Sequence, residues 1–306
     1  MTTRPGRDPI DAKMPAMLLA PGKLRRSLWL SGVLATLLVA LLAGCATIDE
    51  QQRRWIFQPG ARTWAGAAAA EGMQDVWIEH ESAALGQRVR LHGLWLPQSS
   101  PQAPVLLYLH GARWDVRSSS HRMRRLQQLG FSVLGIDYRG FGRSTDSLPS
   151  ETQALEDALA AWQWLGAEKG LAPRYVFGHS LGGALAVQLA ARVSDAKGLI
   201  VEGSFTSIPD VVSSFKWGWL PVGPFITQRF DAAAEIGRVK APVLVVHGEA
   251  DSLIPHALGR ALFERAPEPK RFVLVANGSH HNTNSLGQAQ YRVALQELFG
   301  LPGARQ

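Results

Sequence analysis

The fold of this chain is decided by one short stretch, Tyr175-Val176-Phe177-Gly178-His179-Ser180-Leu181-Gly182. Its first three residues predict a strand, and the helical spacing over Leu181–Val193 predicts a helix that follows directly. A turn this tight leaves no room for side chains two residues before or after its centre, where Gly178 and Gly182 stand. The stretch therefore predicts a strand–turn–helix unit that lifts the Ser180 hydroxyl above a sheet. The N–H groups of the helix N-terminus would face any oxyanion formed there.

Short apolar runs alternate with helical periodicity on both sides of this stretch. Strands are expected at Gln74–Glu81, Val89–Leu96, Val105–Leu109, Ser132–Ile136, Arg174–Phe177, Gly198–Val201, Pro242–Val246 and Arg271–Val275. Helices are expected at Ser118–Leu129, Glu151–Leu165, Leu181–Val193, from about His256 to Phe263, and at Gln288–Phe299. The first two strands alternate apolar and polar residues, which indicates an antiparallel pair exposed on one face. The remaining pattern makes βαβ units, so we expect an α/β fold with a mostly parallel, doubly wound sheet of about eight strands.

One connection between expected strands is much longer than the others. It covers about residues 204–239, and a connection of that length needs structure or a function of its own. We interpret it as a small lid. Its apolar residues, Trp217 and Trp219 among them, would pack on the body of the domain or line an apolar acyl pocket above Ser180.

A serine hydroxyl becomes a good nucleophile only when a base takes its proton, and histidine is the usual base. His280 and His281 follow the last expected strand, at the sheet edge where doubly wound folds bind their ligands. His92 lies in the expected antiparallel pair. His110 and His247 each precede a glycine at a strand end, where structural roles are commoner. The base is therefore expected to be His280 or His281.

The base in turn needs a carboxylate that fixes its tautomer and supports its charge. Asp251 follows the expected strand Pro242–Val246, while Glu202 and Glu249 are rivals at neighbouring strand ends. In α/β enzymes with a serine nucleophile on such a turn, the chain order is serine, then acid, then histidine. That order favours Asp251.

An oxyanion at the reacting carbon needs two hydrogen-bond donors. The N–H of Leu181 is one, because this residue follows the serine and opens the helix. The second should come from the loop after the third expected strand, which reads His110-Gly111-Ala112-Arg113. The Ala112 N–H is the first choice and the Arg113 N–H the next. Arg113 and Trp114 would either meet an anionic or flat substrate group or form a solvated rim.

The first 44 residues have the features of an export signal. A basic cluster at Lys23–Arg26 precedes an uncharged apolar stretch over Ser27–Ile48, which contains Leu42-Ala43-Gly44-Cys45. This ending resembles the lipobox of bacterial lipoproteins, in which the cysteine thiol receives a diacylglycerol and becomes the first mature residue. Cys45 is the only cysteine of the chain. An uncleaved transmembrane anchor is the alternative, but acidic rather than basic residues follow the apolar run, which favours the lipoprotein.

We therefore expect an export signal over 1–44, a lipidated tether and lead-in over 45–73, and the α/β domain over 74–300. Met14 or Met17 is an alternative true start. A membrane would hold the protein through lipidated Cys45. By resemblance to bacterial sorting rules, the residue after this cysteine favours the outer membrane, facing the periplasm.

Charge and cysteine content restrict the partners. Residues 1–44 carry four of the seven net positive charges, so the remaining 262 residues carry three. That balance is ordinary for a soluble surface and gives no nucleic-acid footprint. With one cysteine the chain has no internal disulfide, although an exported protein could form one.

From about Val89 to Phe299 the chain resembles the α/β-hydrolase superfamily. Within it, the chain is similar to small-lid serine hydrolases that include eukaryotic membrane-associated acyl-protein thioesterases and many bacterial relatives. The segments that carry the resemblance are Tyr108-Leu109-His110-Gly111, Asp137-Tyr138-Arg139-Gly140-Phe141-Gly142-Arg143-Ser144, the Ser180 turn, and the loops of Asp251 and His281. The family pattern Gly-x-x-His-Asn falls on Gly278, His281 and Asn282, which favours His281 over His280 as the base.

The resemblance implies hydrolysis of a carboxylic ester or thioester by Ser180, His281 and Asp251, without metal or organic cofactor, on a small or lipid-like acyl substrate. The same three residue types serve amidases and peptidases, and a surface lipoprotein could keep the fold as a non-catalytic binding module. Family members usually have a polar, often Asn-bearing stretch after His110-Gly111, whereas this chain has Ala112-Arg113-Trp114-Asp115. The substrate mouth therefore does not transfer from the family.

Overall fold

A computed structural model describes most of the chain. The described residues are 46–61, 63, 67–170, 172–215 and 218–301, with isolated positions at 2, 29, 31, 34–36 and 44. The chain divides into two compact units, Met1–Ile48 and Asp49–Gln306. Apart from those isolated positions, the expected export signal lies outside the described residues, as do both alternative start methionines and Cys45. Among the residues that are described, none of the helices combines the length and apolar character needed to cross a bilayer.

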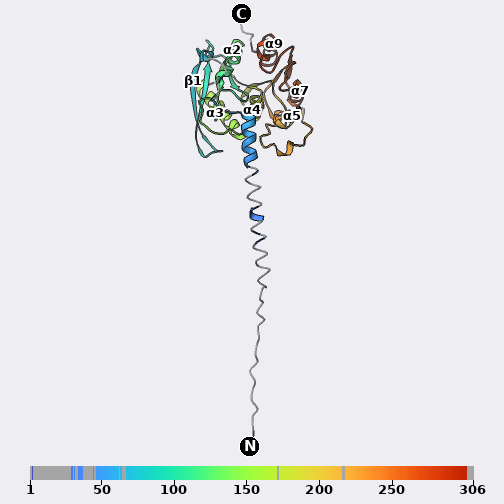
Figure 1. Ribbon diagram of the computed structural model, residues 1–306. Coiled ribbons are helices and arrows are strands. Elements are labelled where there is room, and N and C mark those ends of the chain that lie inside the picture. The colour runs from blue at the N-terminus through green and yellow to red at the C-terminus, as the bar shows by residue number, and fades with distance from the viewer. Residues whose placement is uncertain are drawn as a thin grey trace. The chain divides into compact units, whose positions relative to one another are not determined.

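An eight-stranded sheet runs through the larger unit, in the order β1-β2-β4-β3-β5-β6-β7-β8 (Figure 1). The strands are β1 (Gln74–Ser82), β2 (Gln87–Leu96), β3 (Val105–Leu109), β4 (Ser132–Ile136), β5 (Arg174–His179), β6 (Ala196–Glu202), β7 (Val243–Gly248) and β8 (Lys270–Val275). Strand β2 pairs antiparallel with both β1 and β4, and every other neighbouring pair is parallel. The expected mostly parallel sheet of about eight strands is confirmed.

Helices cover both faces of the sheet. They are α2 (Ser120–Gln128), α3 (Glu151–Lys169), α4 (Leu181–Ala190), α5 (Ile208–Ser213), α6 (Ala232–Glu235), α7 (His256–Arg265), α8 (Thr283–Leu286) and α9 (Gln288–Phe299). Short 3₁₀ turns add η1 (Ala67–Ala70), η2 (Val116–Ser119), η3 (Gly223–Phe225) and η4 (Ile236–Arg238). Helix α3 begins at a capping box, because Ser150 Oγ accepts from the Gln153 N–H while the Gln153 side chain accepts from the Ser150 N–H.

Two apolar clusters form the core, one on each face of the sheet. Successive side chains of a strand point to opposite faces, so Leu107 and Leu109 of β3 join one cluster while Leu106 and Tyr108 join the other. Helices α3, α4 and α7 contribute to the first cluster, and α2 and α9 contribute to the second. This two-sided burial explains why β3 is apolar throughout.

The first hairpin differs from expectation. Strand β2 is buried at every residue from Leu91 to Leu96, so the pair is not simply exposed on one face. His92 is only 1% exposed, and its ring contacts Asp137 Oδ2 at 3.1 Å and Asp75 Oδ1 at 2.7 Å. The cause is β4, which pairs with the second half of β2 and brings Asp137 against it.

The expected tether and lead-in belongs partly to the folded body. Residues 49–57 are helical, and the Phe57 ring is fully buried. Its centroid lies 5.5 Å from that of Phe230 and 6.4 Å from that of Phe141. The buried Phe57 ring therefore joins the start of the larger unit to the α/β core.

The long connection between β6 and β7 has structure of its own, as expected. It contains α5, η3, α6 and η4. The part nearest β7 packs into the core through Phe230, Ala232 and Ile236, all fully buried. The part between α5 and η3 is largely exposed, and Trp217 lies there outside the described residues.

Candidate active site

Ser180 occupies the sharp turn between β5 and α4. Its backbone has φ 56° and ψ −124°, a conformation that non-glycine residues rarely adopt. Such strain persists only where the surroundings fix the backbone. Here the Ser180 N–H donates to the Glu202 carbonyl at 3.0 Å, and the Ser180 carbonyl accepts from the Gly183 N–H and the Ser204 hydroxyl, each at 2.8 Å. Hydrogen bonds to its N–H and to its carbonyl therefore hold the serine at the carboxyl end of β5.

The two glycines of the turn are sterically required. A Cβ placed on Gly178 would lie 2.1 Å from the Gly182 carbonyl oxygen, and one on Gly182 would lie 2.2 Å from the Leu109 carbonyl oxygen. The loop after β3 also reaches the serine, since a Cβ on Gly111 would lie 3.1 Å from Ser180 Cβ. The turn and this loop thus pack directly against each other.

Asp251 and a histidine meet at the carboxyl ends of β7 and β8. His280 Nδ1 lies 2.8 Å from Asp251 Oδ2, and both side chains are buried. The other carboxylate oxygen accepts from the Leu253 and Ile254 N–H groups at 3.0 and 2.9 Å. Burial by itself would raise the pKa of Asp251, but hydrogen bonds from His247 and His280 outweigh it and hold that pKa well below its usual value. The carboxylate is therefore ionised and oriented toward the His280 ring.

The expectation that His281 partners Asp251 was wrong, because the ring beside that carboxylate belongs to His280. A tight turn decides which ring faces inward. Asn282 Oδ1 accepts from the Ser279 N–H at 2.7 Å, and the Thr283 N–H donates to the Ser279 carbonyl at 3.2 Å. This closure buries His280 and leaves His281 exposed.

The His179 side chain holds the His280 backbone in place. His179, next to the nucleophile, donates from Nε2 to the His280 carbonyl at 2.9 Å, and the two rings lie 4.8 Å apart. Burial lowers the pKa of His179 well below its usual value, with the Arg122 charge acting in the same direction. A neutral ring with its proton on Nε2 fits this donor role. The sequence places His179 in the turn but carries no signal for this contact.

Glu202, the rival acid, is engaged elsewhere. Arg122 Nε donates to Glu202 Oε1 at 2.9 Å, and the Tyr291 hydroxyl donates to the other carboxylate oxygen. Arg122 also reaches the His281 carbonyl at 3.4 Å. The third candidate, Glu249, is exposed. Of the three acids, Asp251 is the one against the His280 ring, while Glu202 links α2 to α9 through Arg122 and Tyr291.

The two expected oxyanion donors belong to segments next to Ser180. Leu181 is the first residue of α4, and Ala112 lies in the loop that packs on the serine. Arg113 has φ 84°, and its N–H donates to the Phe57 carbonyl at 2.9 Å. The second-choice donor is therefore already engaged, which leaves the Ala112 N–H as the better candidate.

The expected pocket residues have different environments. The side chains of Arg113 and Trp114 are exposed, in agreement with a solvated rim. Trp219 is 72% exposed, so it does not line an enclosed acyl pocket in this conformation. Within the described part of the chain, no group of three or more His, Cys, Asp or Glu side chains is arranged to hold a metal ion.

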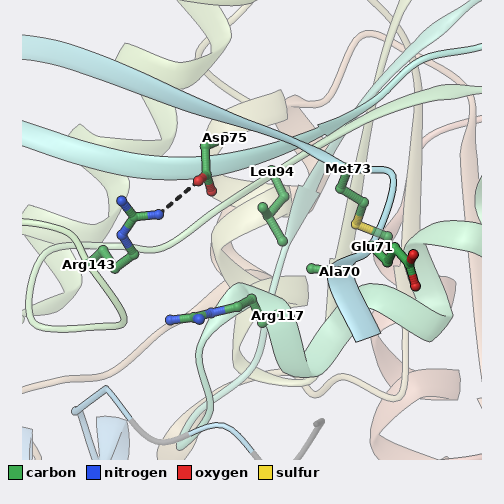
Figure 2. Close-up of a pocket in the computed structure, with 7 residues that line it drawn as sticks. All are labelled: Ala70, Glu71, Met73, Asp75, Leu94, Arg117 and Arg143. Atoms are coloured by element: carbon green, nitrogen blue, oxygen red, sulfur yellow. Dashed lines mark hydrogen bonds and ion pairs between the residues drawn. The ribbon is translucent and has the colours of Figure 1, made fainter. Parts of the chain in front are cut away.

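A hollow of about 420 Å³ lies apart from these residues (Figure 2). Its lining residues are Ala70, Glu71, Met73, Asp75, Leu94, Arg117 and Arg143. Figure 2 shows Arg143 directed toward Asp75, and their charged atoms lie 2.9 Å apart. None of Ser180, Asp251 and His280 lines this hollow, so it is not the candidate active site.

Comparisons with known proteins bear on the family of this chain. A family model described as serine aminopeptidase, S33 (Hydrolase_4), matches residues 100–230. An uncharacterized protein of Mycobacterium tuberculosis is 34% identical over 255 residues, which cover 81% of this chain and 88% of that protein. Lysophosphatidylserine lipase ABHD12 of Danio rerio is 35% identical over 186 residues, covering 55% of this chain and 48% of the lipase. This chain thus spans about half the length of that lipase.

Solved structures show the same fold at low identity. Est1E from Butyrivibrio proteoclasticus, with ferulic acid bound, superposes with a TM-score of 0.60 at 18% identity, covering 74% of this chain and 99% of Est1E. The esterase Pf2001 of Pyrococcus furiosus gives a TM-score of 0.60 at 20% identity, covering 79% of this chain and 97% of Pf2001. The sheet order, the strained serine turn and these relatives together place the chain: it belongs to the α/β-hydrolase superfamily of serine hydrolases.

Proposed function

We propose that this hydrolase cleaves carboxylic esters through a Ser180–His280–Asp251 triad, with the acyl group of a single-chain lipid as substrate class. The observations that carry the proposal are the buried 2.8 Å contact between His280 Nδ1 and Asp251 Oδ2 and the Ser180 backbone held at φ 56° at the end of β5. All three residues follow the carboxyl ends of parallel strands, where doubly wound folds bind ligands.

The first half of the reaction transfers the acyl group to the enzyme. Asp251 fixes the His280 proton on Nδ1 and leaves Nε2 free to act as base. Ser180 Oγ attacks the acyl carbonyl carbon while His280 takes its proton. The carbonyl oxygen becomes an oxyanion facing the N–H groups of Leu181 and Ala112. As the tetrahedral intermediate collapses, the bond to the leaving alkoxide breaks, and His280 returns the proton to that oxygen.

The second half releases the acid. A water molecule gives a proton to His280 and attacks the acyl-Ser180 carbonyl, forming a second oxyanion in the same place. Collapse of this intermediate breaks the bond to Ser180 Oγ, which takes the proton back from His280. One ester and one water are consumed, and one carboxylic acid and one alcohol are released.

The relatives favour an acyl ester of a lipid as the substrate. A relative from Danio rerio carries the name lysophosphatidylserine lipase, and single-chain phospholipids have one acyl ester bond. A thioester is the finer alternative, since the same intermediates serve both bonds. The family model described as serine aminopeptidase, S33, supports a second candidate function. This is hydrolysis of the peptide bond that follows the N-terminal residue of a peptide.

One panel of substrates tests these alternatives. It contains a short p-nitrophenyl ester, monoacyl glycerophospholipids of several acyl lengths, an acyl-coenzyme A thioester and an aminoacyl p-nitroanilide. We expect the esters to be cleaved fastest and Ser180→Ala to lower kcat/KM for them by about 10³-fold or more. Retention of wild-type ester hydrolysis by Ser180→Ala would overturn the triad. Preferential cleavage of the anilide would move the substrate class to peptides, and complete inactivity with every substrate would favour a non-catalytic binding module.

We also propose that Cys45 is lipidated after export and tethers the enzyme to the outer membrane, facing the periplasm. The support is the basic cluster, the apolar stretch and Leu42-Ala43-Gly44-Cys45 in the sequence. The test is incorporation of labelled palmitate into the full chain expressed in a bacterium, with Cys45→Ala as control. We expect label in the wild-type chain alone. Equal label in both, or a chain that keeps residues 1–44, would contradict lipidation at Cys45.

A further inference from the structure

The outer end of the lid is unusually apolar for an exposed segment. It lies in the gold-to-orange part of the chain that follows α5 (Figure 1). We call its exposed large apolar residues the apolar lid tip: Phe215, Trp219, Leu220, Val222 and Phe225. Trp219 is 72% exposed and Phe225 71%. Exposed large apolar side chains gathered in a short segment are typical of a surface that binds a protein, a ligand or a membrane.

The exposure is confined to the tip and is not a general property of the lid. Phe230 and Ile236, later in the same connection, are fully buried in the core. Ile208 and Val211 of α5, which precede the tip, are also buried. The lid therefore has buried apolar residues at both ends and a projecting apolar middle, so the tip can meet a partner without the fold of the lid opening.

The helix over residues 49–57 is hydrogen-bonded to the lid beside this tip. Gln52 Nε2 donates to the Phe225 carbonyl at 2.7 Å, and Gln52 Oε1 accepts from the Thr227 N–H at 2.9 Å. Asp49 Oδ1 accepts from the Thr227 hydroxyl at 2.6 Å and from Gln228 Nε2 at 2.9 Å. These hydrogen bonds fix the start of the larger unit to Phe225, the last residue of the tip, and to Thr227 and Gln228, which follow it.

Chain connectivity brings the proposed lipid anchor to the same place. Cys45 precedes Asp49 by four residues. Four residues of extended chain span at most about 14 Å, so a lipid on Cys45 enters its membrane within that reach of Asp49. Trp55 on the same helix is also exposed, at 60%.

We propose that the apolar lid tip docks onto the surface of a lipid bilayer, with Trp219 and Phe225 entering the boundary between headgroups and acyl chains. Tryptophan suits that boundary because its ring is apolar and its N–H remains hydrogen-bonded. The docked tip would also bring the lid to a surface that holds single-chain lipids.

The test uses residues 46–306, which contain the larger compact unit and lack Cys45. All proteins carry Ser180→Ala, so no lipid is hydrolysed and binding is measured independently of catalysis. Unilamellar vesicles of equal parts phosphatidylethanolamine and phosphatidylglycerol are titrated in a sedimentation assay. Vesicles with brominated acyl chains then report whether tryptophan fluorescence is quenched. The variant is Trp219→Ser with Phe225→Ser, and the matched control is Leu286→Ser with Val293→Ser, two exposed apolar residues on α8 and α9.

We expect the parent to bind vesicles and the lid double variant to bind at least about tenfold more weakly, because it lacks the two aromatic rings that the bilayer would bury. The control should bind as the parent does, and brominated lipid should quench the parent more than the lid variant. Circular dichroism and urea unfolding should show all three to be folded alike. Equal binding by parent and lid variant would overturn the proposal.

The same parent and lid variant distinguish two other ways in which the tip could be covered. If the parent is a dimer in sedimentation equilibrium and the lid variant a monomer, with no vesicle binding by either, a second copy of this chain covers the tip. If neither protein binds vesicles or self-associates, and the lid variant loses only affinity for a soluble lysophospholipid, the tip belongs to the acyl pocket. Either result contradicts docking on a bilayer, and neither depends on whether Cys45 carries lipid.

Discussion

His280 Nδ1 lies 2.8 Å from Asp251 Oδ2, whereas the adjacent His281 is exposed and engages Arg122 only through its backbone carbonyl. Two neighbouring imidazoles thus have opposite environments. The turn closed by Asn282 decides which of them is buried. This asymmetry allows one residue to serve as the test and its neighbour as the control.

Replacing each histidine with glutamine separates their roles. Glutamine removes the base but keeps a polar side chain of similar length. We expect His280→Gln to lower kcat/KM for a p-nitrophenyl ester by about 10³-fold or more, and His281→Gln to lower it by less than about tenfold. The reverse ranking would restore His281 as the base and would require the turn at Ser279–Asn282 to rearrange in the active enzyme.

The low pKa of Asp251 gives a pH-dependent contribution to stability. An unfolded aspartate titrates near pH 4, and the folded carboxyl titrates well below that value. Its contribution to the free energy of unfolding is therefore fully present above about pH 4 and is lost as pH falls toward the folded pKa. We expect the free energy of unfolding of the wild type to exceed that of Asp251→Asn by about 2 kcal/mol at neutral pH. Urea unfolding between pH 2.5 and 7 measures this difference.

The sign of that trend is the critical result. Carboxyl groups other than Asp251 titrate in both proteins, so their effects cancel in the difference. The difference should be constant above about pH 5 and shrink as the pH is lowered. A difference that grows on acidification would mean that the folded protein favours the protonated carboxyl, contrary to the hydrogen bonds from Leu253 and Ile254 N–H and from His280.

Much of the fold follows from the sequence because strands buried on both faces are apolar without interruption. The expected strand Val105–Leu109 has the same bounds as β3, and Ser132–Ile136 the same as β4. The expectation of a half-exposed hairpin was wrong at His92, since that histidine is buried by carboxylates 17 and 45 residues away in sequence. Alternation along a strand carries no information about such distant partners.

The site was less accessible to sequence reasoning. Glycine spacing located Ser180 because backbone oxygens exclude a Cβ at Gly178 and Gly182. A strand end followed by Asp251 located the acid beside His280. The choice between the two histidines depends on a side-chain-to-backbone bond from Ser279 to Asn282, which no periodicity encodes. The contacts of Arg122 depend on tertiary packing in the same way.

Arg122 is expected to position the loop of His280 and His281, because Glu202 holds the guanidinium, which in turn donates to the His281 carbonyl. Removing the guanidinium in Arg122→Met leaves the fully buried Glu202 carboxylate with the Tyr291 hydroxyl alone, which should cost about 3 kcal/mol of folding free energy. Because Arg122 also contacts the His281 carbonyl, kcat should fall more than KM rises. Glu202→Gln combined with Arg122→Met removes the uncompensated charge and should recover stability. If the double variant is no more stable than Arg122→Met, the ion pair does not account for the loss.

Gly182→Ala tests the steric requirement of the nucleophile turn. The new Cβ would stand 2.2 Å from the Leu109 carbonyl oxygen, so the backbone must shift, at a cost of about 1–3 kcal/mol and with loss of most activity. Gly223→Ala is the control, because no heavy atom lies within 4 Å of a Cβ built there. Thermal unfolding and ester hydrolysis measure both effects. A Gly182→Ala enzyme with wild-type activity would contradict the tight turn.

The most direct test of the triad is covalent labelling with a fluorophosphonate, followed by mass spectrometry of the digested protein. Such a probe reacts with a serine only when its hydroxyl is activated by a base. We expect one adduct in the wild type, on the peptide that contains Ser180, with labelling abolished in His280→Gln and retained in His281→Gln. An adduct on another serine, or labelling of Ser180 at the wild-type rate in His280→Gln, would contradict a Ser180–His280–Asp251 triad.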